Sequence, residues 1–165
     1  MSREASYGKT KLNNVKEDSA LSVLLNADAT FQRPDAKARK KILELLGLGD
    51  YSSRAFDLIQ TKVPLLPINA QNVAEHLDEI SLVEVKATKA AIEDDNLHGF
   101  FFGATDNEYR LAAKLGDRYR FGFVVLSPKG SGPPFYVLLT LNQVEARTRT
   151  KRVQYQVNLR GKPKA

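Results

Sequence analysis

The segment ISLVEVKATK, residues 80–89, constrains the fold of this chain more than any other feature of its sequence. Side chains alternate between the two faces of a β-strand, so Glu84 and Lys86 share one face. Val83 and Val85 lie on the other. Both faces are apolar up to Glu84, a pattern typical of a strand that is covered on both sides. We therefore predict a central strand whose charged pair lies where the strand emerges from the core, a position suited to a functional site.

Helix and strand signals alternate along the rest of the chain. Pro34 suits the first position of a helix that runs to about Leu46. Thr105 or Asp106 can cap a later helix that Gly116 ends. Strands that alternate with helices predict an α/β domain with a single mixed β-sheet flanked by helices. The other expected elements are a short helix in DSALSVLLNA capped by Asp18 or Ser19, strands in SRAFDLIQTKV, RYRFGFVVLS and FYVLLTL, and a short aromatic strand in FFFGA.

The 165 residues of the chain are enough for one domain that buries most of its apolar surface. We expect a flexible N-terminal arm over residues 1–18, the folded domain over residues 19–160 and a C-terminal tail over residues 161–165. No apolar run approaches the length of a membrane span, and the N-terminus lacks the apolar core of a signal peptide. These features predict a cytoplasmic protein with no membrane partner.

Side chains that bind soft metals are scarce in this sequence. The chain has no Cys and 2 His, which excludes a disulfide framework, a thiolate zinc site and a histidine-rich metal site. Any bound metal would therefore be a hard cation held by oxygen atoms.

The net charge of +6, from 25 Lys and Arg against 19 Asp and Glu, is a mild excess compatible with a polyanionic partner. Two runs, RPDAKARKK and EARTRTKR, concentrate the basic residues. Each run is either a solvated face or a surface that contacts phosphates. The candidate nucleic-acid-binding residues are Lys37, Lys40 and Lys41 in the first run and Arg147, Arg149, Lys151 and Arg152 in the second.

The pattern Glu84-Val85-Lys86 can carry metal-assisted chemistry at the end of a strand. The Glu84 carboxylate can hold a divalent cation, and the backbone carbonyl of Val85 can add a second oxygen. Lys86 can orient or deprotonate a water beside the metal and offset charge that develops on a phosphate. The alternative is a partly exposed salt bridge between Glu84 and Lys86. A similar pattern that begins at Asp35 lies in the first turn of a helix, where an acid complements the helix dipole.

One carboxylate holds Mg²⁺ poorly, so this interpretation needs a second acid. Asp57 is the first candidate, because it is a charge within the apolar run AFDLI and its strand is expected beside that of Glu84. The alternative is a buried acid satisfied by backbone donors. Asp78 is the second candidate. Glu44 could supply a third acid or be a solvated helix residue.

The order of helix, strand with Asp57, strand with Glu84-Val85-Lys86, helix and strand resembles the PD-(D/E)xK nuclease superfamily. The resemblance implies a restriction-endonuclease-like αβββαβ core and an endonuclease that hydrolyses phosphodiester bonds in DNA with Mg²⁺ or Mn²⁺. Asp57, Glu84 and Lys86 would then be catalytic, and Asp57, Glu84 and the Val85 carbonyl would bind the metal. The sequence departs from the superfamily motif at Phe56, which stands where a proline often precedes the first acid.

Residues 50–126 also resemble the NO VEIN C-terminal domain family. Those domains carry a Glu-Val-Lys-Thr-like strand, an aromatic strand, a helix that opens near Asn-Glu, and a Gly-Asp-Arg-Tyr strand. We expect Asn107 and Glu108 to cap their helix rather than to contact substrate or metal. The matching positions are Glu84 to Lys86, Phe100 to Phe102, Asn107, Glu108, and Gly116 to Tyr119.

Three alternatives to a DNA endonuclease fit the same residues. The chain could be a nuclease-fold module that binds nucleic acid without cutting it, or a protein-interaction domain in which Glu84 and Lys86 are structural. It could also be a nuclease that prefers RNA. Because one such core cuts one strand, a duplex cut would need a second active site, as in a homodimer.

Overall fold

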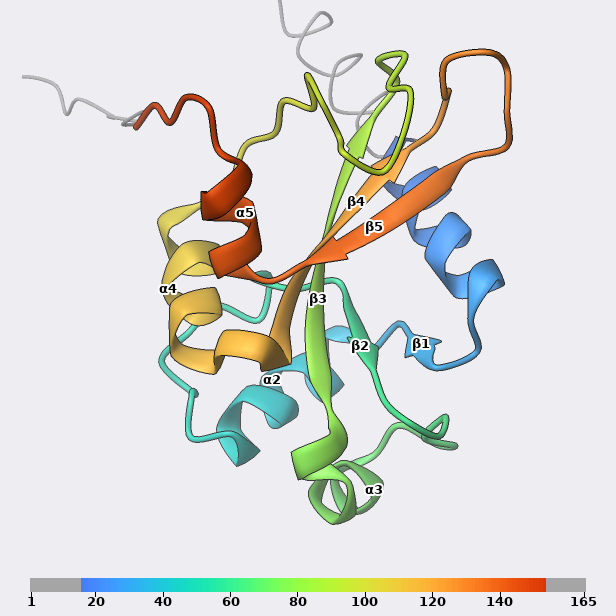
Figure 1. Cartoon of the computed structure of the whole chain (residues 1–165). Coiled ribbons are helices and arrows are strands. Elements are labelled where there is room, and N and C mark those ends of the chain that lie inside the picture. Colours follow the sequence, from blue (N-terminus) through green and yellow to red (C-terminus); the bar gives the residue numbers. More distant parts are fainter. Residues whose placement is uncertain (1–15, 154–165) are drawn as a thin grey trace, which may run out of the picture.

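The computed structural model describes residues 16–153, and Figure 1 shows the course of the chain through them. Most of the arm expected over residues 1–18, and all of the tail expected over 161–165, lie outside the described residues. No helix within residues 16–153 is long and apolar enough to cross a membrane.

The centre of the fold is one five-stranded sheet, built from β1 (Phe31–Gln32), β2 (Leu58–Gln60), β3 (Ser81–Thr88), β4 (Tyr119–Val125) and β5 (Phe135–Leu139). The strands lie in sequence order across the sheet, so β3 is central. Neighbouring strands are antiparallel except β3 and β4, which are parallel. The prediction of an α/β protein with a single mixed sheet is therefore confirmed.

The helices are an N-terminal helix that includes residues 16–27, α2 (Ala36–Leu45), α3 (Ala70–Glu75), α4 (Asp106–Leu115) and α5 (Leu141–Arg147). Two short 3-10 turns, Leu77–Glu79 and Gly116–Arg118, precede β3 and β4. Because β3 and β4 are parallel, the chain must return from the end of β3 to the start of β4 through a crossover connection. Helix α4 lies within this connection.

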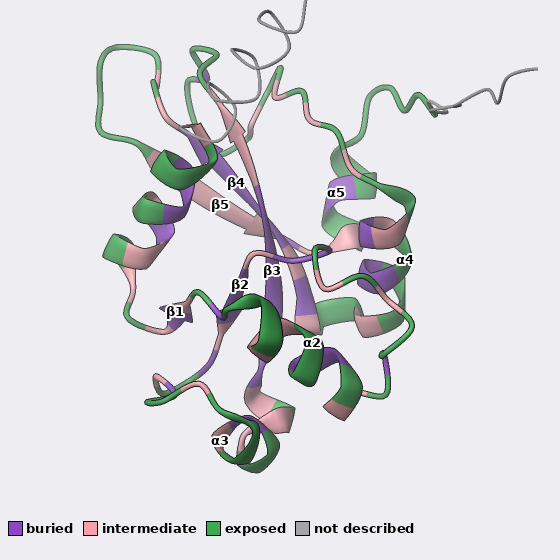
Figure 2. Cartoon of the chain, turned by 180° about the vertical axis from the view of Figure 1, so that it is seen from behind, coloured by how far each residue is buried: buried purple, intermediate pink, exposed green. Residues whose placement is uncertain are grey.

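A separate hydrophobic core lies on each face of the sheet. Residues of α2, α3, α4 and α5 pack together on one face, whereas the N-terminal helix covers the other. Figure 2 shows buried residues on the sides of the helices that face the sheet. Leu82 and Val83 point to opposite faces of β3 and are both 0% exposed, so this strand is covered on both sides as predicted.

Helix α4 follows its sequence signals closely. Thr105 is its N-cap, and the Thr105 Oγ1 atom accepts a hydrogen bond from the backbone N–H of Glu108. Gly116 is its C-cap and has a φ of 55°, a left-handed conformation that glycine adopts without a steric cost. Both of these expectations are confirmed.

Helix α2 begins two residues later than expected, at Ala36 rather than Pro34. Asp35 is the N-cap, because its Oδ1 atom accepts a hydrogen bond of 2.7 Å from the backbone N–H of Ala38. An Asp side chain satisfies a free N–H at a helix terminus, which proline in the preceding position cannot do. The Asp35 carboxylate therefore serves the helix start.

Two further helix boundaries differ from the sequence-based expectation. Asp18 and Ser19 were expected to cap the first helix, but the chain is already helical at residue 16. Helix α5 was not expected at all. Its N-cap is Thr140, which forms a capping box with Gln143. The helix therefore has a local start signal in the sequence, which the prediction overlooked.

The aromatic segment FFFGA is a loop and not the expected strand. Phe100 and Phe102 both pack edge-on against Phe123 of β4, with ring centroids 5.1 Å and 5.0 Å away. The two rings are thus anchored to the sheet by side-chain packing while their backbone stays outside it. Aromatic composition favours a strand but also suits such packing.

The strand that carries Asp57 is shorter than expected and begins only at Leu58. Phe56 and Leu58 would share one face of a regular strand, but they belong to the cores on opposite faces. The alternation fails because residues 53–57 form a turn and bends rather than extended chain. Asp57 therefore lies immediately before β2, at its boundary with this bend.

Candidate active site

The candidate site lies where strand β2 stops covering one edge of β3. β2 pairs with Ser81, Leu82 and Val83, whereas β4 on the other edge continues to Thr88. The second half of β3 is therefore open on the β2 side. Asp57 fills the first position beyond the ladder, with its backbone N–H donating to the Val83 carbonyl at 2.9 Å.

Asp57 also continues the ladder with its side chain. Its Oδ2 atom accepts a hydrogen bond of 2.8 Å from the backbone N–H of Val85. The preceding bend is held in place by Tyr119, whose buried hydroxyl donates to the carbonyl of Ala55. The Asp57 carboxylate is thereby fixed in the plane of the sheet beside the residues that follow Val83.

The carbonyl of Val85 faces the same open edge. Backbone carbonyls alternate between the two edges of a strand, so the Val85 oxygen lies on the same side as that of Val83. The Val83 oxygen accepts from Asp57, and the Val85 oxygen lies beyond that contact. The backbone thus places a carbonyl near the Asp57 carboxylate, where the sequence analysis expected it.

Lys86 joins two buried glutamates. Its Nζ atom lies 2.8 Å from Oε1 of Glu84 and 2.7 Å from Oε2 of Glu108. Glu84 and Glu108 are only 7% and 6% exposed. The salt bridge between Glu84 and Lys86 is therefore present, but it is buried and includes a second acid rather than being partly exposed.

Glu108 links the site to the start of α4. Its Oε2 atom accepts from the backbone N–H of Thr105 at 3.2 Å as well as from Lys86. The sequence predicted only the capping interaction, because a Glu three residues after a Thr is a typical capping box. The ion pair with Lys86 depends on how α4 packs on β3, which no local pattern indicates. Asn107 accepts from the backbone N–H of Ser52 and does not line the site.

The two carboxyl groups of the site repel each other. Burial, and then the negative charge of Asp57, raise the pKa of Glu84 to about 8, although Lys86 acts in the opposite direction. Burial also raises the pKa of Asp57, against the effects of the Val85 N–H and of Lys86. Glu84 therefore carries a proton through much of the neutral range, and the pair titrates as a coupled unit.

One oxygen atom of Glu84 is free in this arrangement. Oε1 accepts from Lys86, whereas Oε2 is buried and accepts no hydrogen bond, and the Glu84 carboxyl lies within hydrogen-bonding reach of Asp57. A buried acceptor without a partner costs free energy, so this atom needs a proton to share or a cation to bind. In the protonated state Glu84 can donate to Asp57, and in the ionised state it offers an oxygen to a cation.

Lys86 keeps its proton at neutral pH. Burial alone would lower its pKa, but Glu84 and Glu108 outweigh that effect and the pKa is raised. Two of the three N–H donors of its ammonium group are used by these glutamates. The remaining donor suits a water or a phosphate oxygen, whereas proton abstraction by Lys86 is disfavoured.

Asp57, Glu84, Val85 and Lys86 line one pocket of about 700 Å³, whereas Glu108 lies behind Lys86 and does not line it. Arg39 reaches it from α2, where its Nη1 atom donates to the Phe56 carbonyl at 3.3 Å and its buried Nε atom has no partner. Arg54 and Phe101 line the same pocket. None of these three residues stands out in the sequence, because each is one of many basic or aromatic residues until the fold brings them together.

Other acidic residues differ in their relation to the pocket. Asp78 lies in the 3-10 turn before β3, at the opposite end of the strand from Lys86, and Glu44 is exposed and pairs with Lys41 at 3.4 Å. Neither lines the pocket, whereas Glu17 of the N-terminal helix does. Burial, followed by the charge of Asp57, raises the pKa of Glu17. Glu17 was not a candidate, because it lies within the expected arm of residues 1–18 and before the first expected helix.

Within residues 16–153, no three His, Asp or Glu side chains form a cluster that could hold a metal ion. The oxygen donors that line the pocket at this strand edge include the carboxyl groups of Asp57 and Glu84 and belong to the class of ligands that hard cations prefer. The free Oε2 atom of Glu84 is the observation that favours this fit.

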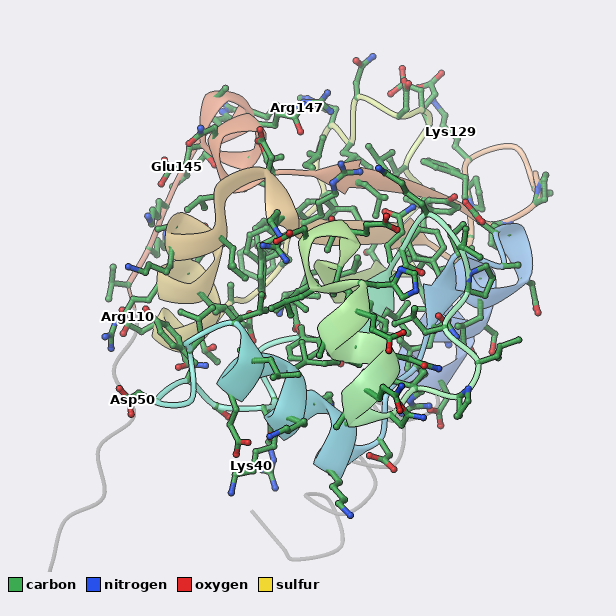
Figure 3. The ribbon with its side chains drawn as sticks, turned by 90° about the horizontal axis from the view of Figure 1, so that it is seen from below. Lys40, Asp50, Arg110, Lys129, Glu145 and Arg147 are labelled. Carbon is green, nitrogen blue, oxygen red and sulfur yellow. The ribbon has the colours of Figure 1, made fainter. Side chains whose placement is uncertain are left out.

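The two basic runs lie in different parts of the molecule. Lys37, Lys40 and Lys41 are exposed on α2, and Figure 3 shows Lys40 and Arg147 on opposite sides of the view. Lys151 lies 3.8 Å from Glu145 and 4.5 Å from the centre of the Tyr109 ring, so part of its charge is engaged within the protein. Arg149 and Arg152 are exposed beyond α5.

No protein-family model matches this chain, and comparisons with curated proteins and with solved structures find no match.

Proposed function

We propose that this chain is a metal-dependent endonuclease that hydrolyses phosphodiester bonds in DNA, built on a restriction-endonuclease-like core of the PD-(D/E)xK superfamily. The observation that carries the proposal is the meeting of Asp57, Glu84 and Lys86 at one open strand edge, with Oε2 of Glu84 free. Two neighbouring carboxyl groups can hold a hard cation, and a protonated lysine beside them can offset negative charge that develops on a phosphate.

Asp57, Glu84 and the Val85 carbonyl would hold Mg²⁺ or Mn²⁺. Such a cation, when bound, polarises a phosphate and makes a nearby water more acidic. Glu84 must lose its proton for this role, so binding is favoured as the pH rises. The negative charge of Asp57 raises the pKa of Glu84 because the two charges repel each other. A cation between the two carboxylates would attract both of them and so offset this repulsion.

Lys86 would act as a hydrogen-bond donor. Its free N–H can orient the attacking water or bind a nonbridging phosphate oxygen, and its charge offsets negative charge that accumulates on the phosphate. Glu84 and Glu108 hold the ammonium group in place. Arg39 and Arg54 line the pocket and supply further positive charge for the substrate backbone.

A plasmid-nicking assay tests this function. We expect nicking of supercoiled DNA by the purified chain with millimolar Mn²⁺ or Mg²⁺, and no nicking after chelation by EDTA. Glu84→Gln should be inactive because the amide cannot bind the cation as a carboxylate does. Asp78→Asn, a change outside the pocket, should retain activity. Cleavage that persists unchanged in Glu84→Gln would place the chemistry elsewhere.

A non-catalytic nucleic-acid-binding or protein-interaction module is the second candidate. The observation that favours it is the double contact of Lys86 with Glu84 and Glu108, since a buried Glu-Lys-Glu bridge can also serve to hold α4 on the sheet. DNA binding without nicking in any divalent metal would support the binding module. Nicking confined to RNA substrates would retain the chemistry and change the substrate.

Phosphate contacts should appear in the salt dependence of DNA affinity. Each phosphate neutralised contributes about 0.9 to the slope of log affinity against log salt concentration. We expect Lys37→Gln, Lys40→Gln and Lys41→Gln together to reduce this slope by about 2–3, because α2 also carries the pocket residue Arg39. The corresponding changes at Arg147, Arg149 and Arg152 should reduce it less. Fluorescence anisotropy at several salt concentrations measures both, and an unchanged slope in the α2 variant would remove this helix from the binding surface.

A further inference from the structure

Phe101 presents an exposed aromatic ring at the candidate active site. Its exposed fraction is 89%, although it stands between two phenylalanines that pack on the sheet. Val63, Leu66 and Val153 are the other exposed large hydrophobic residues in the part of the chain that the structure describes. None of them lines the pocket that contains Glu84 and Lys86, whereas Phe101 does.

The backbone on either side of Phe101 is anchored by its neighbours. Phe100 and Phe102 meet Phe123 in edge-on contacts with interplanar angles of 83° and 77°. Phe102 also contacts Phe121, and Thr105, the N-cap of α4, follows three residues later. A segment anchored on both sides loses little backbone entropy when the intervening ring binds a ligand, which favours a contact at this position.

The rest of the pocket defines what the ring can contact. Arg39 and Arg54 supply positive charge, and the free N–H of Lys86 and the Asp57–Glu84 pair lie on the same pocket. An aromatic ring beside cationic groups is the combination with which proteins bind unpaired nucleotides, through base stacking and phosphate contacts. The pocket volume of about 700 Å³ lies within the range of small-molecule sites, which suits one nucleotide.

Only a base that is not stacked within a duplex can contact this ring. In an intact duplex both faces of each base are covered by neighbouring bases, so an aromatic side chain in a pocket has no free face to contact. A single-stranded or extruded nucleotide offers that face. We propose that Phe101 stacks on the base of an unpaired nucleotide whose phosphate lies in this pocket, so that the substrate is single-stranded or locally unpaired DNA. This inference rests on the proposed function and specifies its substrate class.

Binding without cleavage tests the inference. The full chain is titrated, in EDTA, with a single-stranded oligonucleotide that contains 2-aminopurine and with a duplex of the same sequence. Base stacking is sequence-tolerant and large enough that Phe101→Ala should weaken single-strand binding at least about tenfold. It should also reduce the quenching of 2-aminopurine on binding. Duplex affinity should change less than about twofold, because the phosphate contacts remain.

Two matched variants define the effect. Phe101→Trp keeps a stacking surface and should retain single-strand affinity, whereas Leu66→Ala removes an 81% exposed side chain outside the pocket and should change nothing. The inference is overturned if Phe101→Ala loses affinity equally for single strand and duplex, or loses none for either. Neither result contradicts the endonuclease proposal, which the nicking assay tests. If wild type binds single strands through Phe101 but never nicks DNA, the endonuclease proposal fails and the stacking contact stands.

Discussion

Replacement of Lys86 with alanine should reduce metal-dependent DNA cleavage by a factor of about 10²–10⁴, the range typical of a positioned proton-transfer or charge-stabilising group. DNA affinity should stay within a few-fold, because one ammonium is a small part of the phosphate-facing charge. The reason lies in its position: Lys86 is held 2.8 Å from Glu84 and 2.7 Å from Glu108, with one donor left for the reacting groups. Single-turnover cleavage and anisotropy binding separate the two quantities.

Controls distinguish this role from a structural one. Loss of Lys86 leaves the buried Glu108 without its cation, so thermal melting must show that the variant is folded. Lys86→Arg preserves the charge and should fold. This variant should still cleave poorly, because its larger planar group would displace the attacking water that Lys86 is proposed to orient. Lys129→Ala removes a lysine paired with Glu93 at an exposed site and should cleave normally. A Lys86→Ala protein that loses affinity but still cuts bound DNA would show that Lys86 is a binding residue.

Local patterns were sufficient to predict the central part of the sheet. The run around Val83 is apolar on both faces, and this indicated a strand covered on both sides. The Thr105 and Gly116 signals located α4 correctly because helix caps depend on short-range hydrogen bonds. Glu84 and Lys86 were placed on one face by the period of the strand, and their contact follows from it.

Features that depend on tertiary packing were predicted less well. Asp57 was expected to project from one face of a strand, but it accepts the Val85 N–H at the end of the β2 ladder, because the chain before it bends. The second partner of Lys86 is Glu108, which the capping box explained fully at the level of sequence. Phe101 is indistinguishable from its neighbours in the run FFFGA until the packing of those neighbours leaves it exposed.

Replacement of Glu84 with glutamine should remove a pH-dependent loss of stability. The folded-state pKa of Glu84 is raised from 4.5 to about 8, so the folded protein binds this proton more tightly than the unfolded chain does. The favourable contribution is complete below about pH 4.5 and is lost as the pH rises through about 8. Since each pKa unit is worth about 1.4 kcal/mol, the loss is on the order of a few kcal/mol. Gln cannot ionise, so urea denaturation of Glu84→Gln between pH 5 and 9 should show a smaller decline than wild type, whereas Asp78→Asn should match wild type.

Mn²⁺ should restore the stability that the wild-type protein loses when Glu84 ionises. A ligand that binds only the folded state stabilises it by RT ln(1 + [L]/Kd), about 2.7 kcal/mol at a hundredfold excess over Kd. For a domain of this size that corresponds to an increase in Tm of about 5–10 °C. The increase should be larger at pH 8.5 than at pH 6, because at low pH the cation competes with the proton on Glu84.

Variants of the site and of matched acids decide whether the cation acts there. Asp57→Ala and Glu84→Gln should lose the Mn²⁺-dependent increase in Tm, since each removes one of the two carboxylates. Asp78→Ala and Asp35→Ala should keep it, because neither residue lines the pocket. If Asp78→Ala loses the increase in Tm and Asp57→Ala retains it, then the second metal ligand is Asp78 and not Asp57. An unchanged wild-type Tm at millimolar Mn²⁺ and pH 8.5 would mean that the buried Glu84 and Lys86 serve the fold alone, because the free oxygen of Glu84 would then have no cation to bind.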